Sequence, residues 1–320
     1  MPSPKFLRLT AFVATALLAT PAFAQGLYSS VEALWLDRES TDHVVAFFDG
    51  DSANHPNEPA LSANRFSFDL QVGPRLTLGK DFGNGTAIEG TYFGLQHWSS
   101  GAVVVDPAEN LQPSFLSGGN TFDDFEDAFS YVADYSSELH SVEVNLRRQV
   151  RPNASVTFGV RYARLEETFN LSSFDEDPSI TTTDVGFWSS NTENDLIGLQ
   201  IGGEMNFMFF DFLTVGFDGR AGMYLNFISN DFSITNHGFN QQEQPTVTSI
   251  KDRENEEALA SIVEVGMNVG FIVRPGIEAA IGYDVMMLNG VALAIEQQIN
   301  SVETGTLVLY GPSARIIFRR

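Results

Sequence analysis

Charged and amide residues that alternate with apolar ones are the residues of this sequence best placed to do chemistry. Side chains of both signs that line a narrow passage order the ions that cross it. The same side chains, when tightly paired, fill the passage and close it. The set is Glu32, Asp69, Arg75, Glu143, Asn145, Arg147, Arg161, Gln200, Glu204, Asp218, Arg220, Glu264, Asn268 and Arg315. Which outcome applies depends on the width of the passage that the surrounding elements form.

Acidic residues also gather in two short stretches between the predicted strands. Clustered carboxylates are ligands for Ca²⁺, but neither stretch has the spacing or the glycine turn of an EF-hand loop. We therefore interpret both as a solvated acidic rim, which repels anions and concentrates cations. We expect no metal site and no cofactor. The two clusters are Asp123, Asp124, Glu126 and Asp127, and Asp175, Glu176 and Asp177.

The histidines offer little support for catalysis. A barrel hydrolase needs a histidine held beside a carboxylate or a serine. His140 and Ser141 are adjacent, but neighbouring side chains of a strand point to opposite faces, so these two cannot form a pair. We predict that the protein is not an enzyme, with a barrel hydrolase as the weakest alternative.

A two-residue hydrophobic period runs through most of the chain and predicts long strands with one apolar and one polar face. The clearest segment is 66–80, where apolar residues from Phe66 to Leu78 alternate with polar ones. Similar segments cover 139–148, 155–166, 194–207, 213–227 and 261–274, and weaker ones cover 27–38, 86–98, 277–289 and 307–319. This makes about ten strands, several of them long enough to cross a bilayer at a tilt. The faces of 86–98 cannot be assigned.

Short and long connections alternate strictly between these segments. The short ones are 81–85, 151–153, 210–211 and 275–276, and the long ones are 39–65, 99–134, 170–191, 228–257 and 291–303. Outer-membrane barrels have short periplasmic turns and long extracellular loops, and their closed sheets leave no backbone group unpaired in lipid. We predict an all-β fold, a closed antiparallel transmembrane β-barrel with its apolar faces toward lipid. A soluble β-sandwich or lipocalin-like barrel is the alternative, and it gives no reason for this sorting of loops.

The N-terminus has the pattern of a secretory signal peptide. Lys5 and Arg8 precede an apolar run over 9–19, and residues 22–24 have the sequence Ala-Phe-Ala of a cleavage site. The run is shorter than the roughly 20 residues of a membrane-spanning helix. We expect residues 1–24 to be cleaved and residues 25–320 to form one barrel in the outer membrane after export to the periplasm.

The composition narrows the class of protein. With 18 basic and 41 acidic residues, the formal charge is -23, which argues against binding to nucleic acid because its phosphates need Lys and Arg. The absence of cysteine excludes disulfides and thiolate metal sites. The 27 glycines and 27 phenylalanines, with 43% hydrophobic residues, are typical of a folded β-rich chain.

Several segments carry a resemblance to a known family. They are 135–147 (Tyr-Ser-Ser-Glu-Leu-His-Ser-Val-Glu-Val-Asn-Leu-Arg), 159–167, 194–203, and 282–294 followed by Glu296 and Gln297. Over nearly the whole chain after the signal peptide, the sequence resembles the planctomycete family of β-barrel outer-membrane porins. The resemblance implies an outer-membrane barrel and no catalytic residues. One departure is the ending Phe318-Arg319-Arg320, where barrel-assembly machinery generally favours a terminal aromatic residue.

The strand count decides between an open and a filled passage. Eight strands leave just enough room for the barrel's own side chains, whereas 16–18 strands enclose an aqueous channel. We therefore expect one network that blocks free flow, formed by Arg147, Arg161 and Arg220 with Glu143, Glu204 and Asp218. The predicted function is a narrow porin-like channel or a structural membrane protein, with a cell-surface interaction protein as the alternative. Expected partners are the lipid bilayer, the barrel-assembly machinery and, for the alternative, a cell-surface protein layer.

Overall fold

The structure is a computed structural model that describes eight segments of the chain. They are residues 26–40, 45–49, 58–62, 65–113, 123–174, 185–239, 245–297 and 302–319. The expected signal peptide and the cluster Asp175, Glu176 and Asp177 lie outside these segments. Within them, no helix has the length and apolar character needed to cross a membrane.

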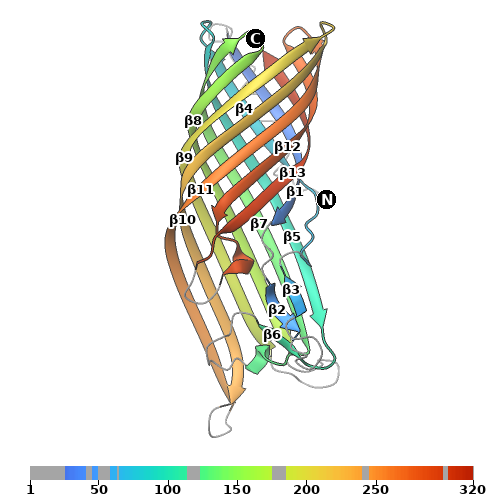
Figure 1. Ribbon diagram of the computed structural model, residues 1–320, viewed down its shortest axis with the longest axis vertical. Helices are drawn as coiled ribbons and strands as arrows, with labels where there is room; N and C mark the ends of the chain where they lie inside the picture. Colours follow the sequence, from blue (N-terminus) through green and yellow to red (C-terminus); the bar gives the residue numbers. More distant parts are fainter. Residues whose placement is uncertain are drawn as a thin grey trace, which may run out of the picture.

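Ten antiparallel strands close into a single barrel, which confirms the predicted fold class (Figure 1). The order around the barrel is β1, β13, β12, β11, β10, β9, β8, β7, β5, β4, so that the last strand pairs with the first. The strands are β1 (Leu27–Ser40), β4 (Gln71–Asp81), β5 (Thr86–Val105), β7 (Ser130–Arg151), β8 (Ala154–Phe174), β9 (Val185–Phe209), β10 (Leu213–Phe239), β11 (Pro245–Arg274), β12 (Ile277–Val291) and β13 (Gly305–Arg319).

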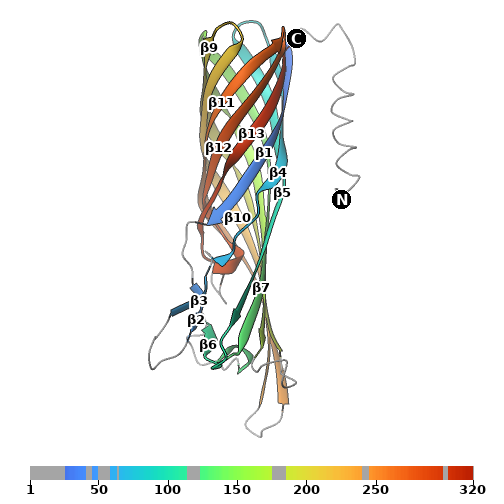
Figure 2. The same ribbon diagram turned by 90° about the vertical axis from the view of Figure 1, so that its right-hand side faces the viewer.

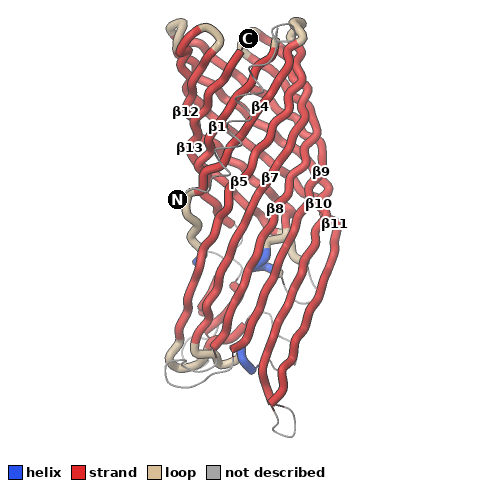
Figure 3. Tube along the Cα trace, turned by 180° about the vertical axis from the view of Figure 1, so that it is seen from behind, coloured by secondary structure: helices blue, strands red, loops and turns tan. Residues whose placement is uncertain are grey.

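The barrel wall is much longer on one side than on the other. β11 has 30 residues and β10 has 27, whereas β12 and β13 have 15 each. The short turns lie together at one end, and at the other end β5 and β7 to β11 continue as a curved sheet (Figures 1 and 3). β12 pairs with β11 only from Ser261 onward, so the ring is closed only in the part next to the short turns.

The polarity of the alternation inverts part-way along the long strands. In β8 the outward residues are apolar from Val156 to Tyr162 and polar from Arg164 to Ser172, while the inward residues change from Arg161 to buried Ala163 and Leu165. The same inversion lies near residue 141 in β7, 196 in β9 and 228 in β10. An apolar outer face suits lipid, and a polar outer face over an apolar interior suits water. We term the part next to the short turns the membrane half and the remainder the extracellular half.

This inversion explains why two predicted loops are mostly strand. The expected loops 170–191 and 228–257 shrink to connections at 175–184 and 240–244, because β8, β9, β10 and β11 run on through the extracellular half. There the outward residues are mostly polar, with exceptions such as Val103, Phe187 and Val247, so the pattern of a lipid-facing strand stops although the strand continues. In the membrane half the predicted apolar faces point outward, as expected for contact with lipid, whereas the outward faces of β8 to β10 in the extracellular half are mostly polar.

Segments between the strands fill the inside of the extracellular half. β2 (Val45–Asp49), β3 (Glu58–Ser62) and β6 (Leu111–Pro113) form a separate small sheet, seen below the closed ring in Figure 2. The 3₁₀ helix η2 (Asp123–Phe125) contacts β8, β9 and β10. The 3₁₀ helix η3 (Ala294–Glu296) contacts β8 and β9, and residues 291–297 around it are all buried.

The start of the clearest predicted strand is not a strand. Phe66 and Phe68 lie before β4 and pack inside the barrel, with ring centroids 5.5 Å and 5.4 Å from that of Tyr135. Their alternation therefore reflects packing onto interior aromatic rings and not contact with lipid. Asp69 is exposed in this segment, so its predicted place in the lumen lining is wrong.

The ambiguous faces of 86–98 have a structural cause. The pairing of β5 with β7 shifts in register between Phe93 and Gln96. Leu95 adopts a φ of 70° there, as expected for a β-bulge, which inserts an extra residue into one strand. The bulge changes whether the odd-numbered or the even-numbered residues of β5 point inward. A single alternating pattern therefore cannot describe the whole segment.

Candidate functional site

Opposite charges in the lumen face one another across neighbouring strands. Directly opposite residues on one face of an antiparallel pair have Cβ atoms about 4.5–5.5 Å apart, so the strand register alone brings their side chains together. Three such pairs are Glu32 with Arg75 (3.1 Å between Oε2 and Nη1), Glu143 with Arg161 (3.7 Å between Oε1 and Nη1) and Glu264 with Arg220 (3.6 Å between Oε2 and Nη1).

Further ion pairs join these three across the barrel. Arg161 of β8 also binds Glu264 of β11, and Arg75 of β4 lies 3.5 Å from Glu264 and 2.9 Å from Asp284. Arg220 lies 3.7 Å from Glu143. Glu264 thus contacts arginines from three strands. The lumen network comprises Glu32, Arg75, Glu143, Arg161, Arg220, Glu264 and Asp284.

The centre of the lumen network is shielded from water. The side chains of Arg161 and Glu143 are 1% and 3% exposed. Arg161 donates from Nε to Ser141 at 2.8 Å, and Glu143 accepts hydrogen bonds from Asn145 at 2.9 Å and Gln200 at 2.7 Å. A buried charge is stable only when it is paired and hydrogen-bonded. These contacts meet that need, and they fill the lumen at this level.

The other predicted lumen residues lie in or near the same half of the barrel. Arg147 pairs with Glu89 at 3.1 Å and Glu204 at 3.7 Å. Asp218 lies two residues before Arg220 on the inner face of β10, Asn268 lies on the inner face of β11, and Arg315 is the direct neighbour of Glu32 on β13.

Three acidic lumen residues were missed by the sequence reasoning. Asp284 and Glu278 lie on the polar face of the segment 277–289, so residue parity alone identifies both. Glu278 accepts a hydrogen bond from Thr214 at 2.7 Å and pairs with Arg319 at 2.8 Å. Glu89 precedes the bulge in β5. Because the inward-facing residues alternate differently before and after this bulge, the sequence pattern did not show which way Glu89 points.

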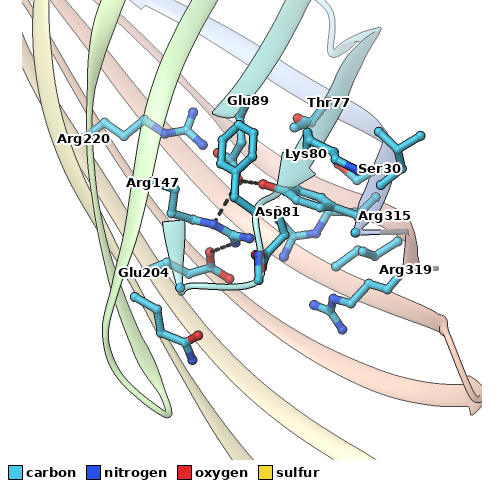
Figure 4. A pocket seen from close by; sticks show the side chains of 18 residues that line it. Ser30, Thr77, Lys80, Asp81, Glu89, Arg147, Glu204, Arg220, Arg315 and Arg319 are labelled. Carbon is cyan, nitrogen blue, oxygen red and sulfur yellow. Dashed lines mark hydrogen bonds and ion pairs between the residues drawn. The ribbon is translucent and has the colours of Figure 1, made fainter. Parts of the chain in front are cut away.

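A cavity of ≈ 930 Å³ lies beside the lumen network at the end with the short turns (Figure 4). We term it the vestibule. In outer-membrane barrels this end faces the periplasm. The charged residues that line it are Lys80, Arg147, Arg220, Arg315 and Arg319, and Asp81, Glu89 and Glu204. The lining therefore has more basic than acidic side chains, in contrast to the chain as a whole.

A second buried ion pair lies in the extracellular half. Arg38 binds Glu167, with side chains 1% and 0% exposed, and its guanidinium lies 4.4 Å from the ring centroid of Phe68. Burial lowers the pKa of Arg38, but Glu167 and Tyr135 raise it above its ordinary value, so the group stays charged. Glu167 also accepts the backbone N–H of Ala294 at 3.1 Å, which fastens η3 to β8.

The connection between β12 and β13 is held inside the barrel by amide side chains. Asn194 accepts the backbone N–H of Ala292 at 2.7 Å and donates to its carbonyl at 2.8 Å, and Asn226 donates to the carbonyl of Gly290 at 3.0 Å. Gln297 donates to Leu293 within the connection at 2.8 Å. Residues 290–297 therefore occupy part of the interior of the extracellular half, as the lumen network occupies that of the membrane half.

The acidic stretch 123–127 does not act as a uniform solvated rim. Asp124 is 2% exposed, accepts the backbone N–H of His237 at 2.7 Å and lies 2.9 Å from its Nδ1. The expectation for Asp124 is therefore wrong, because this carboxylate fastens η2 to β10. Glu126 is half-buried and Asp127 is exposed, while Asp123 is described only in its backbone. Among the described residues, no group of three or more histidines and acids could hold a metal ion.

Comparison with known proteins places the fold among outer-membrane β-barrels. No family model and no curated protein matches the sequence. The outer membrane protease OmpT of Escherichia coli is similar with a TM-score of 0.51 and 9% identity, over 95% of this chain and 100% of that chain. The translocator domain of the autotransporter NalP from Neisseria meningitidis has a TM-score of 0.37 and 10% identity over 99% and 95% of the two chains. At 9% identity the likeness to OmpT shows the fold alone, which is that of an outer-membrane β-barrel.

Proposed function

We propose that the protein is a passive outer-membrane barrel with a closed lumen, either a structural membrane protein or a porin-like channel of very small conductance. The observation that carries the proposal is the burial of Arg161 between Glu143 and Glu264 in the middle of a ten-strand lumen. A solvated ion has no room where a guanidinium is almost inaccessible to water. The buried connection between β12 and β13 supports the proposal independently.

The proposal includes a route to the membrane and a family. The chain is exported to the periplasm, loses residues 1–24, and is inserted by the barrel-assembly machinery. The resemblance to planctomycete outer-membrane porins supports this route. N-terminal sequencing of protein extracted from outer membranes is expected to begin at Gln25, and an intact Met1 in the inserted protein would contradict cleavage.

Conductance measurements test the closed lumen. Purified mature protein in planar bilayers is expected to show only rare, small current steps, because its lumen is filled with paired charges and not with water. Sugar-driven liposome swelling should not exceed that of protein-free liposomes. A general porin of 16–18 strands, which encloses an aqueous channel, is the positive control in the same bilayers. Large, steady currents from the wild-type protein would refute the proposal.

A further inference from the structure

We propose that the open edge of β11 in the extracellular half binds an extended, basic peptide segment of an extracellular partner as an added strand. This inference goes beyond the proposed function, which assigns the protein no partner. It concerns the surface outside the membrane and does not depend on whether the lumen is closed.

One side of β11 has no neighbouring strand through the extracellular half. β11 pairs with β10 from Pro245 to Phe271, whereas its pairing with β12 begins only at Ser261. The hairpin of β10 and β11 therefore extends beyond the end of β12 (Figure 1). Within the described part of the chain, no strand pairs with the other side of residues 245–260, which we term the β11 edge. Such an edge presents a row of backbone N–H and C=O groups that can pair with another chain.

The connection that follows β12 turns away from the β11 edge into the barrel. Gly290 has a φ of 79°, a conformation that glycine adopts without steric cost. Residues 291–297 follow it into the interior, where they are buried. Asn194 and Asn226 hold this connection there by hydrogen bonds to its backbone. Residues 290–297 are therefore fixed inside the barrel and do not cover the β11 edge.

Three acidic residues follow one another on the inner face of the β11 edge. Asp252, Glu254 and Glu256 have the same parity as buried Ala260, so their side chains point to the inner side of the sheet. None of their direct neighbours on β10 is basic, since these are Phe232, Asn230 and Ile228. Partial burial and the two neighbouring carboxylates raise the pKa of Glu254 above its ordinary value. Among the described residues, no basic side chain pairs with any of the three acids.

An added strand with basic side chains would neutralise this row of acids. In an antiparallel pair, directly opposite side chains on one face have Cβ atoms about 4.5–5.5 Å apart, and opposite charges there stabilise the pair. A segment with Lys or Arg at every second residue therefore places one cation against each of the three acids while its backbone pairs with the β11 edge. Strand addition is a general mode of peptide recognition, in which main-chain hydrogen bonds give affinity and alternate side chains give specificity.

The same acids disfavour a second copy of this chain as the occupant. Antiparallel pairing of two β11 edges about Glu254 would place Glu254 opposite Glu254 and Asp252 opposite Glu256. Like charges directly opposite one another destabilise a strand pair. On the outer face, Arg253 is already paired with Asp231 of β10, at 3.6 Å between Nε and Oδ1, so it does not compensate. The charge of the edge therefore fits a basic segment of another protein.

Fluorescence anisotropy with a labelled peptide of alternating Lys and Thr tests the inference. We expect saturable binding to the mature protein in an uncharged detergent, and binding should weaken as NaCl is added because salt screens the attraction. A triple variant that neutralises the inner face of the edge is expected to bind about tenfold more weakly, since three opposite-charge pairs are lost. Its substitutions are Asp252→Asn, Glu254→Gln and Glu256→Gln.

A matched triple variant controls for the overall charge. It removes three acids from the outward faces of β7 and β8, away from the β11 edge. Its net charge equals that of the edge variant, so peptide binding should stay at the wild-type level if the site is the β11 edge. Its substitutions are Asp134→Asn, Glu138→Gln and Glu166→Gln.

Two backbone-modified peptides separate strand addition from simple charge attraction. One is N-methylated at its Thr residues and the other at its Lys residues, so both keep every charge. The N–H groups of alternate residues in a strand point to opposite edges, so only one of the two sets faces β11. One modified peptide should therefore bind like the unmodified peptide, and the other should lose measurable binding.

Each arm of the experiment has an outcome that overturns the inference. These outcomes are no saturable binding by the wild-type protein, equal binding of the two N-methylated peptides, and equal weakening in the edge and control variants. The N-methylated peptides are measured on wild-type protein, so the test stands even if the edge variant does not fold. None of these outcomes bears on the closed lumen, which the bilayer currents test separately.

Discussion

Arg161→Ala is expected to destabilise the barrel and raise its conductance at the same time. The substitution leaves Glu143 and Glu264 buried with Arg220 as their one remaining shared arginine among the described residues and opens space at the buried centre of the lumen network. Breaking a buried ion pair by removing one partner costs about 3–5 kcal/mol. Urea unfolding from lipid vesicles measures the free energy of unfolding, and planar bilayers measure the current of the same preparation.

Arg164→Ala is the matched control on the same strand. Arg164 also forms ion pairs with Glu166 and Glu193, but its side chain points outward and is 35% exposed. Exposed ion pairs contribute only about 0–1 kcal/mol, and this one lies outside the lumen, so the current should not change. If Arg161→Ala changes neither stability nor current, the lumen network is not what closes the barrel, and an open channel becomes the better explanation.

Val144→Arg is expected to be one of the most damaging substitutions on the outer surface. Val144 is 48% exposed on the outward face of β7 in the membrane half, where it contacts lipid. An arginine on the lipid face near the midplane costs about 2–4 kcal/mol. Ser136→Arg, on the same face of the same strand in the extracellular half, should stay within about 0.5 kcal/mol of wild type, as surface substitutions usually do.

Refolding of both variants into vesicles of defined lipid composition measures this difference. Equal stability of Val144→Arg and Ser136→Arg would show that the inversion of polarity does not mark the edge of the lipid. Asn145→Arg is not a neutral control, although Asn145 faces the lumen. Asn145 is 3% exposed and hydrogen-bonds to Glu143 and Gln200, so a larger side chain there would be overpacked and would disturb the lumen network.

The sequence by itself determined the architecture and the lumen face of the membrane half. Period-two alternation identified the strands, because successive strand side chains point to opposite faces whatever the partner strand is. The strict sorting of connections by length identified a closed barrel. Parity within each strand placed Glu143 and Arg161 on one inner surface, and the requirement that buried charges be paired predicted that they meet.

Only the tertiary structure decided which surface each face meets. Apolar and polar residues alternate in the same way in a strand that faces lipid and in a strand that covers an apolar core in water. The pattern therefore could not show where β8 to β11 leave the membrane. It also could not show that Phe66 packs inside the barrel. Contacts across the lumen, such as Arg161 with Glu264, depend on closure and on the tilt and register of ten strands, which no local pattern encodes. Asp124 and residues 291–297 are buried because the segments that contain them pack against the inner side of the strands. Such packing depends on residues far away in the sequence, so the neighbouring residues do not specify it.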